Sequence, residues 1–259
     1  SMDIKWLYET GYPIISEIFK FYNANLEQED DGYLHVPLSS SAEYKENKPQ
    51  AWCKDPNIDL ALIRRCCDWV VDMESALQIN NLSKAAKRVR ESLVPYSLTE
   101  DNVLCLWPGH PLDESHRHPS HLMAIHPAMD LTIDGDGKAL AVINASIEHY
   151  LALGQYMWAG HTYAQMVSFA AITGRTGWAY DSLRQFMDLW IAPNCLHFNR
   201  DLKDTGRTAF RGSFYSEETP PFTMEANCGI SAGISDMLVQ GWNNVVRIFP
   251  AVSDHWQDI

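Results

Sequence analysis

A cluster of ionisable side chains at residues 116–121 constrains the fold of this chain more than any other feature. The stretch His-Arg-His-Pro-Ser-His places three histidines and an arginine within six residues, and the apolar residues Leu122, Met123 and Ile125 follow it. Burying so many ionisable groups costs several kcal/mol unless each one is paired. Two interpretations stay open: the segment lines a polar pocket, or it is a solvated loop that caps the next helix.

Apolar residues recur with the period of an α-helix along most of the chain. Pro13 implies a break or a restart within the first of the predicted helices, and Asn57 or Asp59 is placed to cap the second. Alternation over residues 33–38 indicates one short strand. The pattern predicts helices over residues 4–26, 58–79, 83–93, 137–153, 157–173, 178–192 and 231–242.

Two long loops interrupt the helical pattern. Residues 94–118 and 193–228 show no sustained periodicity, and loops of this length in compact domains are usually functional or disordered. The Trp, Pro and His content of the first loop argues against disorder there. We therefore predict an all-α domain of about seven helices, stacked as hairpins and joined by long loops.

The charge balance limits the partners. The chain carries 20 Lys and Arg against 33 Asp and Glu, which gives a formal net charge of -13. Nucleic acids and anionic membranes are both bound by clusters of Lys and Arg, so neither is an expected partner of this acidic chain. The sequence has no run of about 18 apolar residues to span a bilayer, and no basic, apolar leader. The compartment is left open between the bacterial cytoplasm and secretion.

The six cysteines are scattered and provide no disulfide framework. No C-x-x-C pair and no Cys/His set with zinc-finger spacing occurs, so we expect reduced thiols. His116 and His118 alternate as metal ligands on a strand can, with Asp113 or Glu114 as an oxygen donor, which leaves zinc open as one alternative. A serine or cysteine hydrolase is disfavoured, since there is no G-x-S-x-G and no thiol with an evident base beside it.

Three segments, in order along the chain, carry recognisable motifs. Residues 32–43 run from Gly-Tyr-Leu to Ser-Ser-Ser-Ala-Glu, residues 116–122 read HRHPSHL, and residues 220–229 read PPFTMEANCG. These segments resemble the GYL…PSxSPE, HRHxSHL and PPFQIDGNFG stretches of glycoside hydrolase family 95, the inverting α-L-fucosidases and α-L-galactosidases. The similarity continues through residues 232–240 to the Phe-Pro-Ala of residues 249–251.

The resemblance implies an (α/α)6 toroid, with the sugar bound where the loops of the inner helices converge, and no cofactor. Family members also carry an N-terminal β-sandwich and about twelve helices, whereas the pattern here gives about seven. We therefore expect residues 1–259 to form one toroid-type domain, partial relative to the family, without the β-sandwich and the first helices. An open half-toroid exposes apolar surface, which favours a homo-oligomer or a cover from missing N-terminal domains.

Two carboxylates are the candidate catalytic pair. In the resemblance, Glu43 matches the family's general acid, and Glu225 stands where the family has the aspartate that orients the attacking water. Inverting hydrolysis needs one protonated carboxyl to donate to the leaving oxygen, and a second carboxylate ~6.5–9.5 Å away to activate water. The acid also needs a raised pKa to work near neutral pH. The implied activity is inverting hydrolysis of terminal α-L-fucosides or α-L-galactosides, which these motifs do not separate.

Four further residues are candidates for the substrate site. Arg117 and His118 match family residues that hold sugar hydroxyls, a task that suits cationic and neutral donors. Asn227 is either a substrate ligand or the cap of a turn. Trp107, like Trp158, is either a platform for a sugar ring or a core residue.

Several positions depart from the family pattern. Glu225 is one methylene longer than the family's aspartate, and a displacement of about an ångström can cost roughly a hundredfold in rate. Ala42 replaces a proline, and Ala226 and Cys228 replace a glycine and a phenylalanine. The family's water-binding N-x-N pair recurs in spacing at residues 23–25, but in the wrong segment, where a helix cap is favoured. A competing interpretation is a non-catalytic carbohydrate-binding or structural remnant of such an enzyme.

Overall fold

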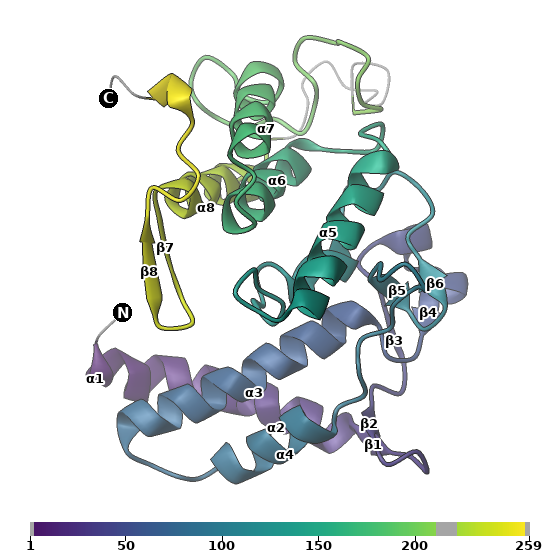
Figure 1. Ribbon diagram of the computed structural model, residues 1–259, viewed down its shortest axis with the longest axis vertical. Coiled ribbons are helices and arrows are strands. Elements are labelled where there is room, and N and C mark those ends of the chain that lie inside the picture. Colours follow the sequence, from purple (N-terminus) through teal and green to yellow (C-terminus); the bar gives the residue numbers. More distant parts are fainter. Residues whose placement is uncertain (1–2, 211–221, 257–259) are drawn as a thin grey trace. The chain divides into compact units, whose positions relative to one another are not determined.

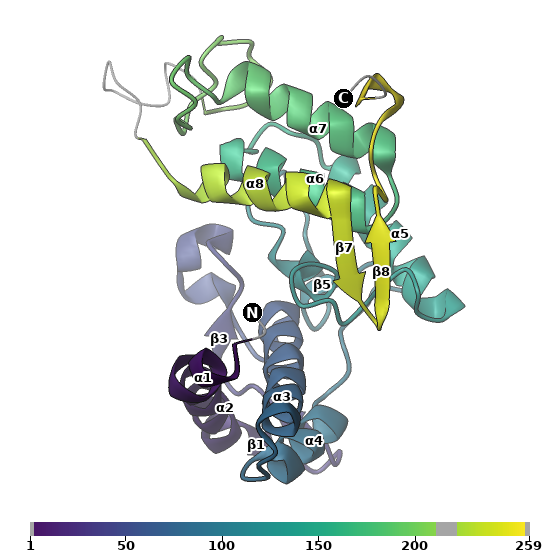
Figure 2. The same ribbon diagram turned by 90° about the vertical axis from the view of Figure 1, so that its left-hand side faces the viewer.

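The computed structural model describes residues 3–210 and 222–256, and Figures 1 and 2 show it from two sides. Helices of all types make up 51% of the described residues, so this part of the chain is mostly helical, in line with the predicted fold class. Within the described residues, seven α-helices, α2 to α8, are ten residues long or longer. The toroidal arrangement stays a prediction.

The chain divides into two compact units. Unit 1 comprises the residues up to Leu112 together with Ser120–Leu131, and unit 2 comprises Asp113–Pro119 together with the residues from Thr132 onward. The cluster at residues 116–121 is therefore shared, with its first four residues in unit 2 and its last two in unit 1. A single domain over residues 1–259 stays a prediction.

The described residues of unit 1 form packed helices and small antiparallel strand pairs (Figure 1). The three-residue helix α1 (Ile4–Trp6) leads into α2 through a π-helical turn. The longer helices are α2 (Tyr12–Asn25), α3 (Asn57–Leu77) and α4 (Ser83–Ser92). The strand pairs are β1 (Glu27–Gln28) with β2 (Leu34–His35), β3 (Ser39–Ser40) with β4 (Trp52–Cys53), and β5 (Cys105–Trp107) with β6 (His110–Pro111).

The strand predicted over residues 33–38 forms only at Leu34–His35. Beyond it, the backbone N–H of Val36 donates to Asp55 Oδ1 at 2.7 Å instead of to a neighbouring strand. Pro37 has no N–H to offer to a ladder. A side chain from elsewhere in unit 1 therefore ends the strand early.

The restart predicted near Pro13 is confirmed. A π-helical turn at Leu7–Gly11 precedes α2, which begins at Tyr12 with Pro13 in its first turn. Proline is tolerated in the first turn of a helix, where its missing N–H has no intrahelical partner to lose. The π-helical turn therefore lets one nearly continuous helix accommodate the proline.

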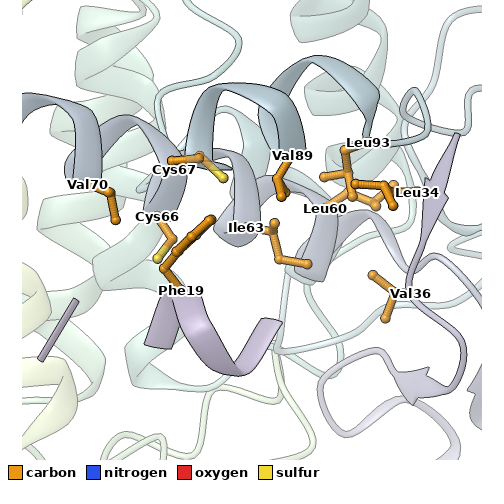
Figure 3. Packing of buried hydrophobic residues seen from close by; sticks show 11 residues of the cluster. Phe19, Leu34, Val36, Leu60, Ile63, Cys66, Cys67, Val70, Val89 and Leu93 are labelled. Carbon is orange, nitrogen blue, oxygen red and sulfur yellow. The ribbon is translucent and has the colours of Figure 1, made fainter. Parts of the chain in front are cut away.

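The core of unit 1 lies between α2, α3 and α4. Leu60, Ile63 and Val70 form the apolar stripe of α3, and Phe19 of α2 and Val89 of α4 pack in the same cluster. Figure 3 shows these side chains gathered together. All five are almost completely buried, and a fully buried side chain of this size contributes roughly 1.5–3 kcal/mol.

The expected side-chain cap of α3 does not form. Pro56 occupies the cap position without a side-chain hydrogen bond, and Asn57 is the first residue of the helix. The Asn57 amide instead bonds the backbone of the long loop: Nδ2 donates to the carbonyls of Ser97 and Cys105 at 2.8 Å, and Oδ1 accepts from the Ser97 N–H at 3.0 Å. The prediction was wrong because the fully buried Asn57 side chain forms hydrogen bonds with the backbone of residues 97 and 105, and none with the N–H groups of its own helix.

Unit 2 is built around helix α6, with α7 and α8 packed against it (Figure 2). Thr162 to Ala164 and Met166 to Ile172 of α6 are all buried, as expected for a helix covered on most of its faces. The helices are α5 (Gly137–Ala152), α6 (Gly160–Ile172), α7 (Thr176–Leu189) and α8 (Glu225–Leu238), and one hairpin pairs β7 (Val239–Trp242) with β8 (Val245–Ile248).

Two glycines let α8 approach α6 closely. A Cβ at Gly233 would lie 2.9 Å from Val167 Cβ, and one at Gly229 would lie 3.3 Å from Ala164 Cβ. Contacts that short force the neighbouring atoms to move. The glycines of the third motif and its continuation therefore serve the packing of α8.

The helix predicted over residues 231–242 is displaced. Helix α8 begins at Glu225 and ends at Leu238, and residues 239–242 are the strand β7. Asn243 and Asn244 both have positive φ, 52° and 59°, in the two-residue turn between β7 and β8. Positive φ at both positions is typical of a type I′ hairpin turn, for which asparagine is well suited. The prediction of a helix up to residue 242 overlooked this Asn-Asn pair.

All six cysteines are free thiols: Cys53, Cys66, Cys67 and Cys105 are buried, and Cys195 and Cys228 are exposed. Among the residues that the structure describes, no helix is long and apolar enough to cross a membrane.

A buried carboxylate, Glu74 of α3, organises the start of α4. Its oxygens accept hydrogen bonds from the hydroxyl of Tyr12 at 2.6 Å and from the N–H groups of Asn81, Leu82 and Ser83 at 3.1, 2.7 and 2.9 Å. Burial would raise the pKa of Glu74, but these hydrogen bonds and that of the Ser83 hydroxyl lower it to about 2. Glu74 thus holds N–H groups that a helix N-terminus leaves without intrahelical partners.

Glu74→Gln should destabilise unit 1 by about 1–3 kcal/mol, since an amide replaces the charged, buried acceptor of several partly buried hydrogen bonds. The folded-state pKa lies below the ordinary value of 4.5, so the stabilisation is complete above that value and is lost as the pH falls towards 2. Urea unfolding against pH measures both effects. Asp72→Asn, an exposed carboxylate on the same helix, is the control, and equal losses in the two variants would contradict this account.

Candidate active site

The candidate site residues are divided between the two units. Glu43 and Trp107 belong to unit 1, whereas Arg117, His118, Glu225 and Asn227 belong to unit 2. Pro220 and Pro221 of the third motif lie outside the described residues. Within each unit, the contacts show how the candidate residues are held.

The loop that carries Glu43 has an unusual backbone. Glu43 is exposed and has φ 52°, and Lys45, Glu46 and Asn47 also have positive φ values, between 48° and 55°. For residues other than glycine this conformation costs about 1–3 kcal/mol each, and it persists only where the surroundings fix it. Such strain concentrates at functional sites.

Buried contacts fix this loop on both sides of Glu43. The hydroxyls of Ser41 and Ser120 lie 2.5 Å apart, and both residues are fully buried. The buried Tyr44 places its hydroxyl 3.1 Å from His110 Nε2. Ser41 comes from the first motif and Ser120 from the second, so a hydrogen bond inside unit 1 joins the two motifs.

Trp107 belongs to an aromatic group beside Tyr44. Its ring stacks on His110 with centroids 4.2 Å apart and planes at 2°, and it meets the Tyr44 ring edge-on at 5.6 Å. The indole is half-buried. A role as a sugar platform stays a prediction. Trp158, by contrast, is 1% exposed and stacks on Tyr150, so it is a core residue.

The backbone of the HRHPSH segment is fastened to the helices of unit 2. The carbonyl of His116 accepts from the Tyr150 hydroxyl of α5 at 2.6 Å, and the carbonyl of Arg117 accepts from Thr162 Oγ1 of α6 at 2.8 Å. His116 itself is buried. The segment is therefore anchored through its backbone, which orients the half-buried side chains of Arg117 and His118.

Aromatic rings support these two side chains. The guanidinium of Arg117 lies over the ring of Phe210, 5.7 Å from its centroid. The ring of His118 stacks on His161 at 4.8 Å and 25°. Each of the two polar groups thus has an aromatic ring against one face.

Glu225 and Asn227 lie in the first turn of α8. Glu225 is exposed, whereas Asn227 is half-buried and its amide bridges the preceding loop. Asn227 Oδ1 accepts from the backbone N–H of His197 at 2.9 Å, and Nδ2 donates to the carbonyl of Cys195 at 3.0 Å. Each end of the amide keeps one further hydrogen-bonding position, so the substrate-binding role stays a prediction.

Two histidines that sequence reasoning missed complete this cluster. Burial and the charge of His118 lower the pKa of His161 to about 4, while the Glu225 carboxylate opposes them. Burial also lowers the pKa of His197, opposed first by the hydrogen bond to the Thr223 backbone and then by the charge of Glu225. Both histidines stand alone in the sequence, so the density of charged residues that marks 116–121 did not identify them.

The described residues contain no group of three or more His, Cys, Asp or Glu side chains arranged to hold a metal ion. The candidate residues of unit 2 are instead hydrogen-bonding and charged groups of both signs. They are Arg117, His118, His161, His197, Glu225 and Asn227. Such a set suits a neutral, hydroxyl-rich ligand.

Unit 2 thus presents the exposed carboxylate of Glu225 together with the half-buried side chains of Arg117 and His118, and unit 1 presents the exposed carboxylate of Glu43. Residues 1–238 match the glycosyl hydrolase family 95 catalytic domain, and the chain belongs to this family. It is 24% identical, over 265 residues, to alpha-L-fucosidase 2 of Arabidopsis thaliana. That alignment covers 99% of this chain and 30% of the relative, so the chain spans less than a third of the relative's length.

The first residue of α6 is a glycine for a steric reason. A Cβ at Gly160 would lie 1.9 Å from Nε2 and 2.6 Å from Cδ2 of His197, a fully buried ring. Gly137, the first residue of α5, has no atom within 4 Å of the same position. The two glycines are thus a matched pair that differ in the space around them.

Gly160→Ala should destabilise unit 2 by about 1–3 kcal/mol, because the new methyl group overpacks against His197. Gly137→Ala should be neutral or stabilising by up to about 1 kcal/mol, because alanine reduces the entropy of the unfolded chain. Chemical unfolding of the two variants measures the difference. A Gly160→Ala variant as stable as Gly137→Ala would contradict the packing described here.

Proposed function

We propose that this chain is a glycoside hydrolase that cleaves terminal α-L-fucosides or α-L-galactosides with inversion, using Glu43 and Glu225. The observation that carries the proposal is the match of residues 1–238 to the catalytic domain of family 95. The name of the Arabidopsis relative, alpha-L-fucosidase 2, supports the sugar class.

In the proposed reaction, Glu43 is the general acid. Its carboxyl group gives a proton to the glycosidic oxygen as the bond from that oxygen to the anomeric carbon breaks. Glu225 accepts a proton from a water molecule whose oxygen attacks the anomeric carbon from the opposite face. The products are the free sugar, with inverted anomeric configuration, and the alcohol. The exposure of both carboxylates supports these roles, because a substrate has to reach them.

Arg117 and His118 would hold the sugar hydroxyls. A guanidinium and an imidazole supply directional donors for hydroxyl oxygens, and both side chains are oriented by aromatic neighbours. Asn227 and Trp107 would add an amide and an apolar ring face to the substrate contacts. No residue in this scheme requires a cofactor.

A second candidate function is carbohydrate binding without turnover. It is favoured by Glu225, which stands in place of the family's aspartate and is one methylene longer. A non-catalytic member of the family would keep Arg117 and His118 and still bind the sugar.

Hydrolysis of aryl and methyl α-L-fucosides and α-L-galactosides tests the first proposal. Glu43→Gln should lower kcat by about 10²–10⁴-fold, the usual contribution of a general acid. The loss should be larger for the methyl glycosides, because a poor leaving group depends more on the donated proton. Glu46→Gln, an exposed carboxylate on the same loop, should retain activity.

Full activity of Glu43→Gln on the methyl glycoside would exclude Glu43 as the acid. A folded chain that binds fucose without hydrolysing any of the four substrates would favour the second candidate.

A further inference from the structure

We infer that His197 is a positioning residue that fixes Glu225, the proposed base-side carboxylate, by holding the residues on both sides of it. The inference rests on the proposed function, which gives Glu225 its role. His197 lies in the loop before α8, and none of the three sequence motifs includes it.

Hydrogen bonds join His197 to both flanks of Glu225. Its backbone N–H donates to Asn227 Oδ1 at 2.9 Å, and its Nδ1 lies 2.7 Å from Thr223 Oγ1 and 3.2 Å from Thr223 O. The backbone N–H of Thr223 donates in return to the carbonyl of His197 at 3.3 Å. Glu225 therefore lies between two residues that one histidine holds.

The tautomer of His197 follows from these partners. We assign the hydrogen to Nδ1, because the carbonyl oxygen of Thr223 only accepts and would otherwise face the lone pair of this nitrogen. Nε2 is then an acceptor, buried and without a hydrogen-bond partner among the described residues. Burial lowers the pKa of His197, which agrees with a neutral ring at this place.

The ring of His197 is enclosed on three sides. It is fully buried, stacks on Phe186 at 5.8 Å and 9°, and lies 6.1 Å from the ring of Trp190 at 25°. On the third side, Nε2 occupies the space that a side chain at Gly160 would need. An imidazole so tightly enclosed has little freedom to shift, so the bond to Thr223 is held in one place.

Filling space does not by itself explain a histidine here. An apolar side chain of similar size would fill the same space without burying an unpaired nitrogen, which carries a desolvation cost. What the imidazole adds is donation to Thr223, two residues before Glu225. Because Glu225 is exposed at the first turn of α8, its position depends on the backbone at either side.

His161 provides a reporter of where the Glu225 carboxylate lies. Burial, His118, Arg117 and His197 lower the pKa of His161, and the Glu225 carboxylate raises it. If the carboxylate moved away, its raising effect on the pKa would disappear.

The first test is a thermodynamic cycle read by NMR titration of the His161 ring. Glu225→Gln should lower the pKa of His161 in the native background and in His197→Asn, whose amide still donates towards Thr223. In His197→Leu, which cannot donate, replacing Glu225 should change that pKa little or not at all. Comparing within each background cancels the direct effect of replacing His197. His197→Gln, whose amide reaches the Nε2 position instead, serves if the leucine variant does not fold.

Kinetics give the second readout. His197→Leu should lower kcat for the fucoside about 100-fold with little change in KM, because the displaced group acts in the chemical step and other residues hold the sugar. His197→Asn should recover most of the lost kcat. His149→Leu, which removes another half-buried histidine of unit 2 on α5, should change neither kcat nor the cycle.

Two results would overturn the inference and leave the proposed function intact: a full effect of Glu225→Gln on the His161 pKa in the His197→Leu background, or equal kcat losses in the leucine and asparagine variants. A native chain with neither turnover nor fucose binding would instead remove the proposed function, and with it the role assigned to His197.

Discussion

The loops that carry the candidate residues depend on buried polar side chains, because their backbone has little regular hydrogen bonding of its own. Buried N–H and C=O groups have to be paired, so a loop can hold one conformation only where other groups pair them. The Asn57 amide pairs backbone groups of Ser97 and Cys105 in the long loop, and the Asn227 amide pairs the backbone of His197 and Cys195 before α8. The Ser41 and Ser120 hydroxyls add a side-chain bond between the first two motifs. The helices give these anchors a rigid frame.

Much of the helical framework could be predicted from the sequence, because the apolar stripe of a helix such as α3 is a local pattern. The end of the chain could not be read in the same way. Residues 239–242 are apolar enough to continue α8, yet the two asparagines that follow favour a tight turn and convert them into a strand. The prediction that Asn57 caps α3 failed for a related reason, since its hydrogen-bond partners lie in a loop 40 residues further along the chain.

The candidate site shows a similar division. Motifs that are dense in sequence made Arg117, His118, Glu43 and Glu225 candidates, whereas His161 could not be recognised as a neighbour of His118. It is an isolated histidine, and only the folded α6 brings it against His118. The period of the apolar residues also shows which face of a helix is apolar, but it does not show which other helix or strand packs against that face. The toroid therefore remains an expectation from the family.

The most direct test of the proposed chemistry is the anomeric configuration of the first product, followed by NMR as an α-L-fucoside is hydrolysed. Two carboxylates that act on opposite faces of the ring invert the anomeric carbon. The account requires β-L-fucose to appear first and the α-anomer to grow in only by mutarotation. Initial release of α-L-fucose would contradict it, because retention requires a covalent intermediate that neither Glu43 nor Glu225 is proposed to form.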